Sequence, residues 1–164
     1  VIGIELVESA VEEFFAEQGI TPTVTQASNN ADIKRYQGQL SGQTIELWVA
    51  DIFALTSEDV GQIDAVYDRA ALIALPPDTR PKYCEHILNI SDNAPQLLVT
   101  IHYDQSQKDG PPFSVSLEQV RQYYSDTYKL TELEDNPSIL NANAALSVTE
   151  HVWLLTPSTA NNNP

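Results

Sequence analysis

Short apolar runs alternate with amphipathic segments along this chain. Residues 63–67 form an apolar run that breaks at the charged pair Asp68-Arg69, and apolar character resumes over residues 70–75. A buried parallel strand that opens into a loop and a short helix has this pattern, because both of its faces are covered and polarity collects at its carboxyl end. Ligands bind at that end of the strands in open α/β sheets.

Two further apolar runs end in the same way. Residues 1–6 carry Glu5, and residues 46–50 are followed directly by Asp51. Because the carboxyl ends of parallel strands share one edge of a sheet, these three ends predict a single cleft of nucleotide size.

The remaining pattern predicts an alternation of helices and strands. Helical spacing covers residues 8–18, 57–60, 79–90 and 116–124, while strand patterns cover 33–40, 43–50, 96–103, 128–134 and 148–155. Residues 21–31 are polar and predict a loop, and Gly19 suits the residue that closes the first helix. The order predicts a doubly wound α/β sheet with antiparallel C-terminal strands, formed by one domain over 1–157 and followed by a polar tail over 158–164.

Charge and composition narrow the function classes. The 164 residues include 8 basic and 23 acidic residues, a formal net charge of -15, which argues against binding to nucleic-acid phosphates or anionic lipid. A single cysteine, Cys84, fits a reducing compartment. No run approaches the roughly 18 apolar residues of a membrane span. We therefore predict a soluble cytoplasmic protein without a nucleic-acid or membrane partner.

Glu5 and Asp51 are candidates for nucleotide binding. A carboxylate at the position of Glu5 can accept hydrogen bonds from a ribose diol, although it can equally favour the N-terminus of the following helix. Asp51 can face an exocyclic amine while Ile52 and Phe53 flank a ring, or it can be an ordinary acid in a turn. Together the two acids favour an adenosine ligand.

Arg69 is the candidate for contact with an anionic group. It could pair with Asp68, which is worth little at the surface, or it could direct its planar donors toward a substrate. The segment from Asp104 to Ser114 contains Gly110-Pro111-Pro112 and predicts a lid or specificity loop. The three histidines lack metal-ligand spacing, and we interpret Cys84 as a packing residue.

Five segments of the chain together have a specific pattern: VIGIELVESAVEEFFAEQG (1–19), ADIFAL (50–55), VYDRAALIALPPDTRPKY (66–83), LLVTIHYDQSQKDGPPFSV (97–115) and HVWLLTP (151–157). The combination of YDRAAL with DGPPF is the most specific part of this pattern. In these segments the chain resembles the thiopurine S-methyltransferase family, the class I S-adenosylmethionine-dependent methyltransferases whose bacterial members are linked to tellurite and selenium oxyanion detoxification.

The resemblance implies a Rossmann-like fold, S-adenosylmethionine as cofactor and a role for each matched residue. Cofactor contacts are implied for Glu5 at the ribose, for Leu6 beside it in the sequence, for Asp51 and Ile52 at the adenine, and for Arg69 between cofactor and substrate. Substrate contacts are implied for Arg69, Asp104, Pro111, Pro112 and Phe113. The family's first strand, with its glycine-containing turn, is expected before Val1, so the resemblance implies an N-terminally truncated domain. Residues 137–147 lack the basic side chains expected in bacterial members.

Methyl transfer from a sulfonium to a thiol or chalcogen acceptor mainly requires alignment and exclusion of water, since such acceptors ionise readily. Arg69 would favour the anionic form of the acceptor or hold the substrate. We expect a monomer that acts on a small-molecule thiol or on a selenium or tellurium substrate. Two alternatives remain open at this point: a nicotinamide-dependent Rossmann oxidoreductase, and a non-catalytic truncated fragment.

Overall fold

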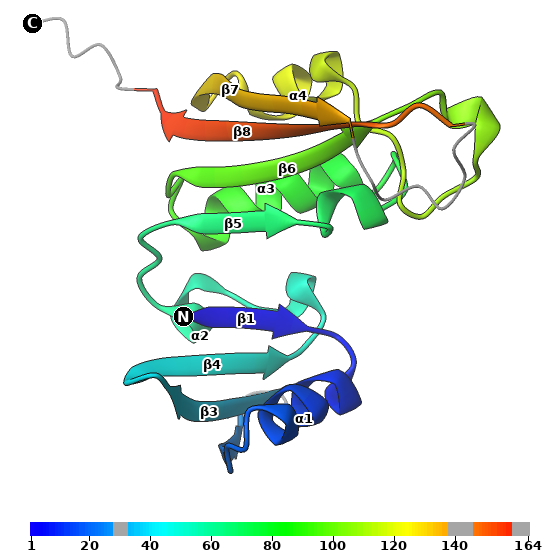
Figure 1. Ribbon diagram of the computed structural model, residues 1–164. Coiled ribbons are helices and arrows are strands. Elements are labelled where there is room, and N and C mark those ends of the chain that lie inside the picture. Colours follow the sequence, from blue (N-terminus) through cyan, green and yellow to red (C-terminus); the bar gives the residue numbers. More distant parts are fainter. Residues whose placement is uncertain (28–32, 138–145, 159–164) are drawn as a thin grey trace, which may run out of the picture. The chain divides into compact units, whose positions relative to one another are not determined.

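The computed structural model describes residues 1–27, 33–137 and 146–158, which divide into two compact units (Figure 1). The first unit spans Val1–Val60 and the second begins at Gly61. Each unit contains a four-stranded sheet with helices, which confirms the predicted α/β class. The predicted polar tail lies outside the described residues from 159 onward.

The first unit is built on a mixed sheet in the order β1-β4-β3-β2. Strand β1 pairs with β4 in parallel, whereas the β4-β3 and β3-β2 pairs are antiparallel. Its elements are β1 (Ile2–Glu5), α1 (Glu8–Glu17), β2 (Thr23–Gln26), β3 (Lys34–Leu40), β4 (Gln43–Val49), the 3-10 helix η1 (Ile52–Ala54) and α2 (Ser57–Val60).

Helix α1 covers one face of this sheet. Its Val11 and Phe15 are each 1% exposed, and they pack with Tyr36 of β3 and Val49 of β4. Gly19 follows the helix at φ 65, which confirms the predicted helix end because glycine adopts this conformation without steric cost. The packed apolar face explains why a helix of ten residues is stable here.

The predicted hairpin is confirmed by β3 and β4. Ser41 and Gly42 connect the strands with φ values of 52 and 79, and Leu40 pairs with Gln43 across them. Two consecutive positive φ angles match the right-handed twist of the flanking strands. The hairpin is therefore closed by the shortest common type of connection.

The prediction of a loop over residues 21–31 is wrong in its first half. Residues 23–26 form β2, an edge strand whose register pairs Thr25 with Arg35. All four of its residues are exposed. An edge strand with both faces in solvent has no apolar alternation, so its sequence, TVTQ, carries only the weak signal of β-branched residues. Residues 28–31 lie outside the described part of the chain.

The second unit contains a sheet in the order β5-β6-β8-β7. Strands β5 and β6 are parallel, and β8 runs antiparallel to both β6 and β7, which confirms the predicted antiparallel finish. Its elements are β5 (Val66–Arg69), η2 (Leu72–Ala74), α3 (Arg80–Ile90), β6 (Gln96–His102), η3 (Gln105–Gln107), α4 (Leu117–Tyr124), β7 (Tyr128–Pro137) and β8 (Thr149–Pro157).

Strand β5 begins later than predicted and runs through the charged pair. It starts at Val66 rather than Ile63 and includes both Asp68 and Arg69. Successive side chains of a strand point to opposite faces, so Asp68 is buried while Arg69 is exposed. The expected short helix after the strand is the single 3-10 turn η2.

Several buried polar groups in the second unit are hydrogen-bonded to one another or to the backbone. Gln96 donates to the hydroxyl of Tyr128 at 3.2 Å, and that hydroxyl donates to the carbonyl of Ala94 at 2.7 Å. Trp153 of β8 donates to Thr100 of β6 at 3.2 Å. These bonds offset the cost of burying polar atoms and fix the register of the central strands.

A substitution at Gly38 tests how closely α1 and the residues after it pack on the sheet. A Cβ at this position would lie 2.8 Å from side-chain atoms of both Phe15 and Ile20. We expect Gly38→Ala to lower the free energy of unfolding by about 1 to 3 kcal/mol, because the added methyl overpacks a close contact. Urea denaturation measures the change, with Gln39→Ala at the neighbouring exposed position as control. A Gly38→Ala variant as stable as the parent would contradict the close contact of Gly38 with Phe15 and Ile20.

Candidate functional site

Glu5 and Asp51 lie at the carboxyl ends of two adjacent parallel strands in the first unit. Glu5 is the last residue of β1 and pairs with Val49, and the amide of Ala50 donates to the Glu5 carbonyl at 3.0 Å. Asp51 follows directly and precedes η1. The structure thus brings together two of the carboxylates that the sequence analysis singled out.

Each of these two acids accepts a hydrogen bond from a backbone amide two residues further along the chain. One Glu5 carboxylate oxygen accepts from the amide of Val7 at 2.8 Å, and one Asp51 oxygen accepts from the amide of Phe53 at 3.0 Å. Both side chains are solvent-exposed, and Leu6 is 70% exposed. Two accessible carboxylates beside an exposed apolar side chain provide acceptors for a ribose diol and a surface for an aromatic ring.

Asp68 and Arg69 do not form an ion pair within the described residues. Asp68 is 2% exposed and accepts from the amide of Leu72 at 3.2 Å and from the hydroxyl of Tyr83 at 3.0 Å. Arg69 points to the opposite, exposed side of β5. The ion-pair alternative is therefore wrong, since Asp68 is a buried anchor and Arg69 is available to a ligand.

The Asp68 anchor shapes the turn that follows Arg69. Ala70 has a φ of 71, a left-handed conformation that is costly for any residue with a Cβ. The bond from the Leu72 amide to Asp68 closes this turn. Burial raises the pKa of Asp68 above its ordinary value, and the hydrogen bonds from Leu72 and Tyr83 oppose that rise. Local strain held by a buried carboxylate often accompanies functional positions.

The predicted specificity loop folds back onto the segment after Arg69. The amide of Phe113 donates to the carbonyl of Ile73 in η2 at 2.6 Å, and the amide of Val115 donates to Ile101 at 2.8 Å. The hydroxyl of Tyr103 donates to the carbonyl of Pro112 at 2.7 Å. The end of the loop thus lies beside the Arg69 turn, as its assignment to one site requires.

Asp104 caps the short helix at the start of this loop. Its carboxylate accepts from Gln107 at 2.9 Å and from the amide and hydroxyl of Ser106 at 3.1 and 2.7 Å. These bonds hold the pKa of Asp104 below its ordinary value, and the bond from Gln107 has the largest effect. Pro111 is exposed and Phe113 is half-buried. Asp104 therefore shapes the loop through its own turn.

Sequence reasoning overlooked two residues that organise this region, Arg80 and Tyr83. Arg80 is fully buried and Tyr83 is 6% exposed, and both lie on α3. A signal existed, because Arg80 shares the helical spacing of the buried positions Cys84 and Ile87. A charged residue within an apolar stripe indicates a specific internal role.

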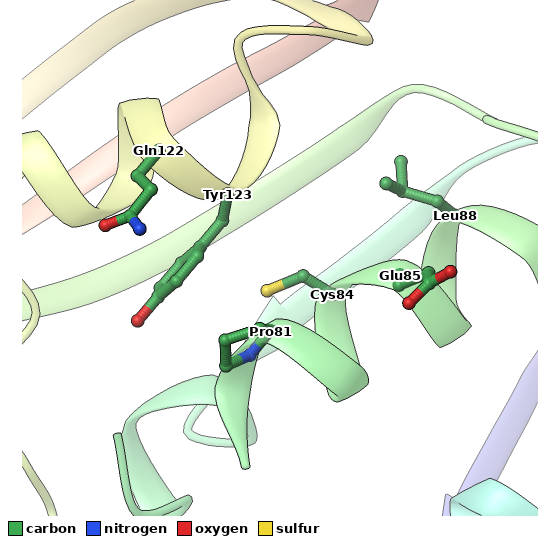
Figure 2. Close-up of a pocket in the computed structure, with 6 residues that line it drawn as sticks. All are labelled: Pro81, Cys84, Glu85, Leu88, Gln122 and Tyr123. Atoms are coloured by element: carbon green, nitrogen blue, oxygen red, sulfur yellow. The ribbon is translucent and has the colours of Figure 1, made fainter. Parts of the chain in front are cut away.

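A small hollow lies between α3 and α4 (Figure 2). It has a volume of about 180 Å³, less than the roughly 300 Å³ at which ligand pockets begin. Cys84 points into it, and burial raises the pKa of this thiol to about 11. The lining residues are Pro81, Cys84, Glu85, Leu88, Gln122 and Tyr123. The hollow is thus smaller than an ordinary ligand pocket, and the 2% exposure of Cys84 agrees with the packing role expected of it.

Two classes of site are not found in the described part of the chain. Its histidine, cysteine and carboxylate side chains form no group of three that could hold a metal ion. Within the same residues, no helix has the length and apolar character required to traverse a membrane.

Fold and sequence both place the chain among known proteins. The structure is similar to the N-terminal domain of EvdMO1, whose crystal structure has SAH bound, with a TM-score of 0.56, 16% identity, and coverage of 96% of this chain and 64% of that chain. The fold is that of a class I methyltransferase domain. The family model for thiopurine S-methyltransferase matches residues 1–157, and the chain belongs to the thiopurine S-methyltransferase family.

Curated relatives agree with this assignment. A thiopurine S-methyltransferase from Psychrobacter cryohalolentis is 60% identical over 154 residues, which cover 94% of this chain and 70% of that protein. One from Xanthobacter autotrophicus is 42% identical over 155 residues, with the same coverage. The predicted family, the methyltransferase class and S-adenosylmethionine as the family's cofactor are confirmed. The nicotinamide alternative is set aside.

Asp68 makes the stability of the chain depend on pH in an unusual direction. Because burial raises its pKa in the folded state, the folded chain binds this proton more tightly, and stability falls as pH rises from about 4 through the folded-state pKa. Asp68→Asn removes this titration, so we expect the stability of the variant relative to the parent to increase over that window. Urea unfolding between pH 4 and 8 measures it, and Asp64→Asn serves as the exposed control. A difference that is constant with pH would contradict the buried carboxylate.

Proposed function

We propose that this chain transfers the methyl group of S-adenosylmethionine to the sulfur of a small-molecule thiol, such as a thiopurine, and to selenium or tellurium acceptors in the same way. The observation that carries the proposal is the exposed Arg69 at the carboxyl end of a parallel strand, beside a loop fastened to the following turn. Membership of the thiopurine S-methyltransferase family supports the same chemistry.

For the cofactor we propose the four residues at the edge of the first sheet. The exposed carboxylate of Glu5 would accept from the ribose hydroxyls, with Leu6 against the sugar. Asp51 would accept from the adenine amine while Ile52 lies against the ring. Charged acceptors on rigid strand ends are suited to this, because hydrogen bonds to a carboxylate are stronger than those to a neutral group.

For the acceptor we propose Arg69 and the loop that ends at Phe113. Arg69 would hold the anionic form of the acceptor, since guanidinium remains charged at all physiological pH values. Pro111, Pro112 and Phe113 would cover the acceptor with apolar surface, and Asp104 would shape the start of the loop. An apolar cover excludes water from the reacting atoms.

The chemistry divides between the cofactor and the chain. S-adenosylmethionine supplies an electrophilic methyl group on a sulfonium. The residues of the chain need to align the acceptor sulfur and to keep it ionised, and Arg69 would do both. A general base is not required for a thiolate, so the proposed set contains none.

Partners and location follow from composition. The net charge of -15 supports our prediction that nucleic acid is not a partner. The single cysteine suits a reducing compartment such as the cytoplasm. A role in tellurite resistance and a monomeric state stay predictions.

Glu5→Gln tests the cofactor assignment. The amide keeps the size of the side chain but loses the charge, and hydrogen bonds to a charged acceptor are worth about 1.5 to 3 kcal/mol. We therefore expect the dissociation constant for S-adenosylhomocysteine to rise about tenfold or more. Calorimetric titration measures it, with Glu13→Gln on the exposed side of α1 as control. Equal affinities for parent and Glu5→Gln would exclude the ribose contact.

Arg69→Ala tests the acceptor assignment. We expect kcat/KM for a thiol to fall about 100-fold, because the acceptor loses both its counter-charge and its alignment. Arg69→Lys, which keeps the charge without the planar fork, should be intermediate. Single-turnover methylation with saturating S-adenosylmethionine measures the loss, and Arg121→Ala, at an exposed position of α4, is the control. An unchanged rate in Arg69→Ala would refute this role.

A further inference from the structure

Arg80 is a buried cation without a carboxylate partner among the described residues. Its exposure is 0%, and none of the ion pairs in that part of the chain includes it. Arginine is seldom fully buried unless it is paired, because removal of its charge from water is costly. Its position therefore requires contacts that only this side chain can make.

The guanidinium of Arg80 joins two segments that are distant in sequence. Nε donates to the carbonyl of Leu75 at 3.0 Å, and Nη1 donates to the carbonyl of Ser114 at 3.1 Å. Its central carbon lies 5.8 Å from the centre of the Phe113 ring, in cation-π geometry. The remaining nitrogen, Nη2, has no acceptor among the described residues.

Both segments belong to the proposed acceptor site. Leu75 directly follows η2 and so ends the turn that begins at Arg69, and Ser114 ends the loop that contains Phe113. The bond from the Phe113 amide to the Ile73 carbonyl joins the same two segments. Arg80 thus fixes the ring of Phe113 at a set distance from the turn that displays Arg69.

We propose that Arg80 is a positioning residue that sets the acceptor specificity of this chain. It holds Phe113 and the loop against the Arg69 turn, and so determines how wide an acceptor fits beneath the ring. The inference rests on the proposed function, because the loop determines specificity only if the acceptor binds there. Arg80 itself does not contact the acceptor in this assignment.

The geometry of the contacts explains why arginine is needed. Two donors at fixed angles reach two carbonyls while the flat face of the same group lies near an aromatic ring. Lysine has a single ammonium that rotates freely and has no planar face. Arg80→Lys therefore keeps the charge but removes the rigid connection.

The first test is whether Arg80→Lys releases the loop. Lys108 lies exposed within the loop, so the rate of trypsin cleavage at this residue reports how firmly the loop is held. We expect cleavage at Lys108 to accelerate about tenfold in Arg80→Lys, relative to cleavage elsewhere in the chain. Arg121→Lys, the same exchange at an exposed position of α4, should leave that rate unchanged.

The second test is whether release of the loop changes acceptor choice. We compare kcat/KM for a bulky aromatic thiol and a small aliphatic thiol in the parent and in Arg80→Lys. We expect the ratio to shift about fivefold or more, mainly through KM for the aromatic thiol, while the affinity for S-adenosylhomocysteine changes less than twofold. If Arg80 had a purely structural role, Arg80→Lys would lower kcat/KM for both acceptors and the affinity for the cofactor together. That result would overturn the inference.

The outcomes separate this inference from the proposed function. If the parent chain neither methylates nor binds any thiol, the proposed function fails and the inference fails with it. If the parent is active and Arg80→Lys exposes Lys108 without a change in the acceptor ratio, only the inference fails. Arg80→Gln provides a neutral second variant, should Arg80→Lys not fold. If neither variant folds, Arg80 is a core residue and the specificity assignment is wrong.

Discussion

Parallel pairing of two strands in each unit sets where the proposed site residues lie. In the first unit it aligns the ends of β1 and β4, and in the second it aligns the ends of β5 and β6. Polar side chains can gather at such ends without entering the core, because the ladder stops there. Glu5 and Asp51 share one of these edges, and Arg69 lies at the other.

Buried polar anchors then convert a strand end into a defined geometry. Asp68 closes the turn after β5 from within, and Arg80 fastens the later loop to the same turn. Each anchor takes a charge out of water, which is unfavourable unless donors or acceptors replace the lost hydration. The conformation of the turn after Arg69 therefore depends on two buried side chains.

The sequence predicted most of the elements because their apolar periodicity was strong. Helices at 8–18 and 79–90 and the paired strands before Ala50 needed only one buried face each. It missed β2, whose four residues are all exposed, and it extended the strand before Asp68 too far toward the N-terminus. The residues joined across the second unit, such as Arg80 and Ser114, could not be predicted, because a local pattern carries no information on partners 34 positions away.

The state of Cys84 has a consequence for an enzyme whose proposed acceptors are thiols and reduced chalcogens. A protein thiolate is itself a sulfur nucleophile, so an ionised cysteine beside the cofactor would compete with the acceptor for the methyl group. The only cysteine of the sequence is 2% exposed, and its thiol has a pKa of about 11, so almost none of it is ionised at neutral pH. Burial and the raised pKa therefore make Cys84 a poor nucleophile toward the cofactor's methyl group.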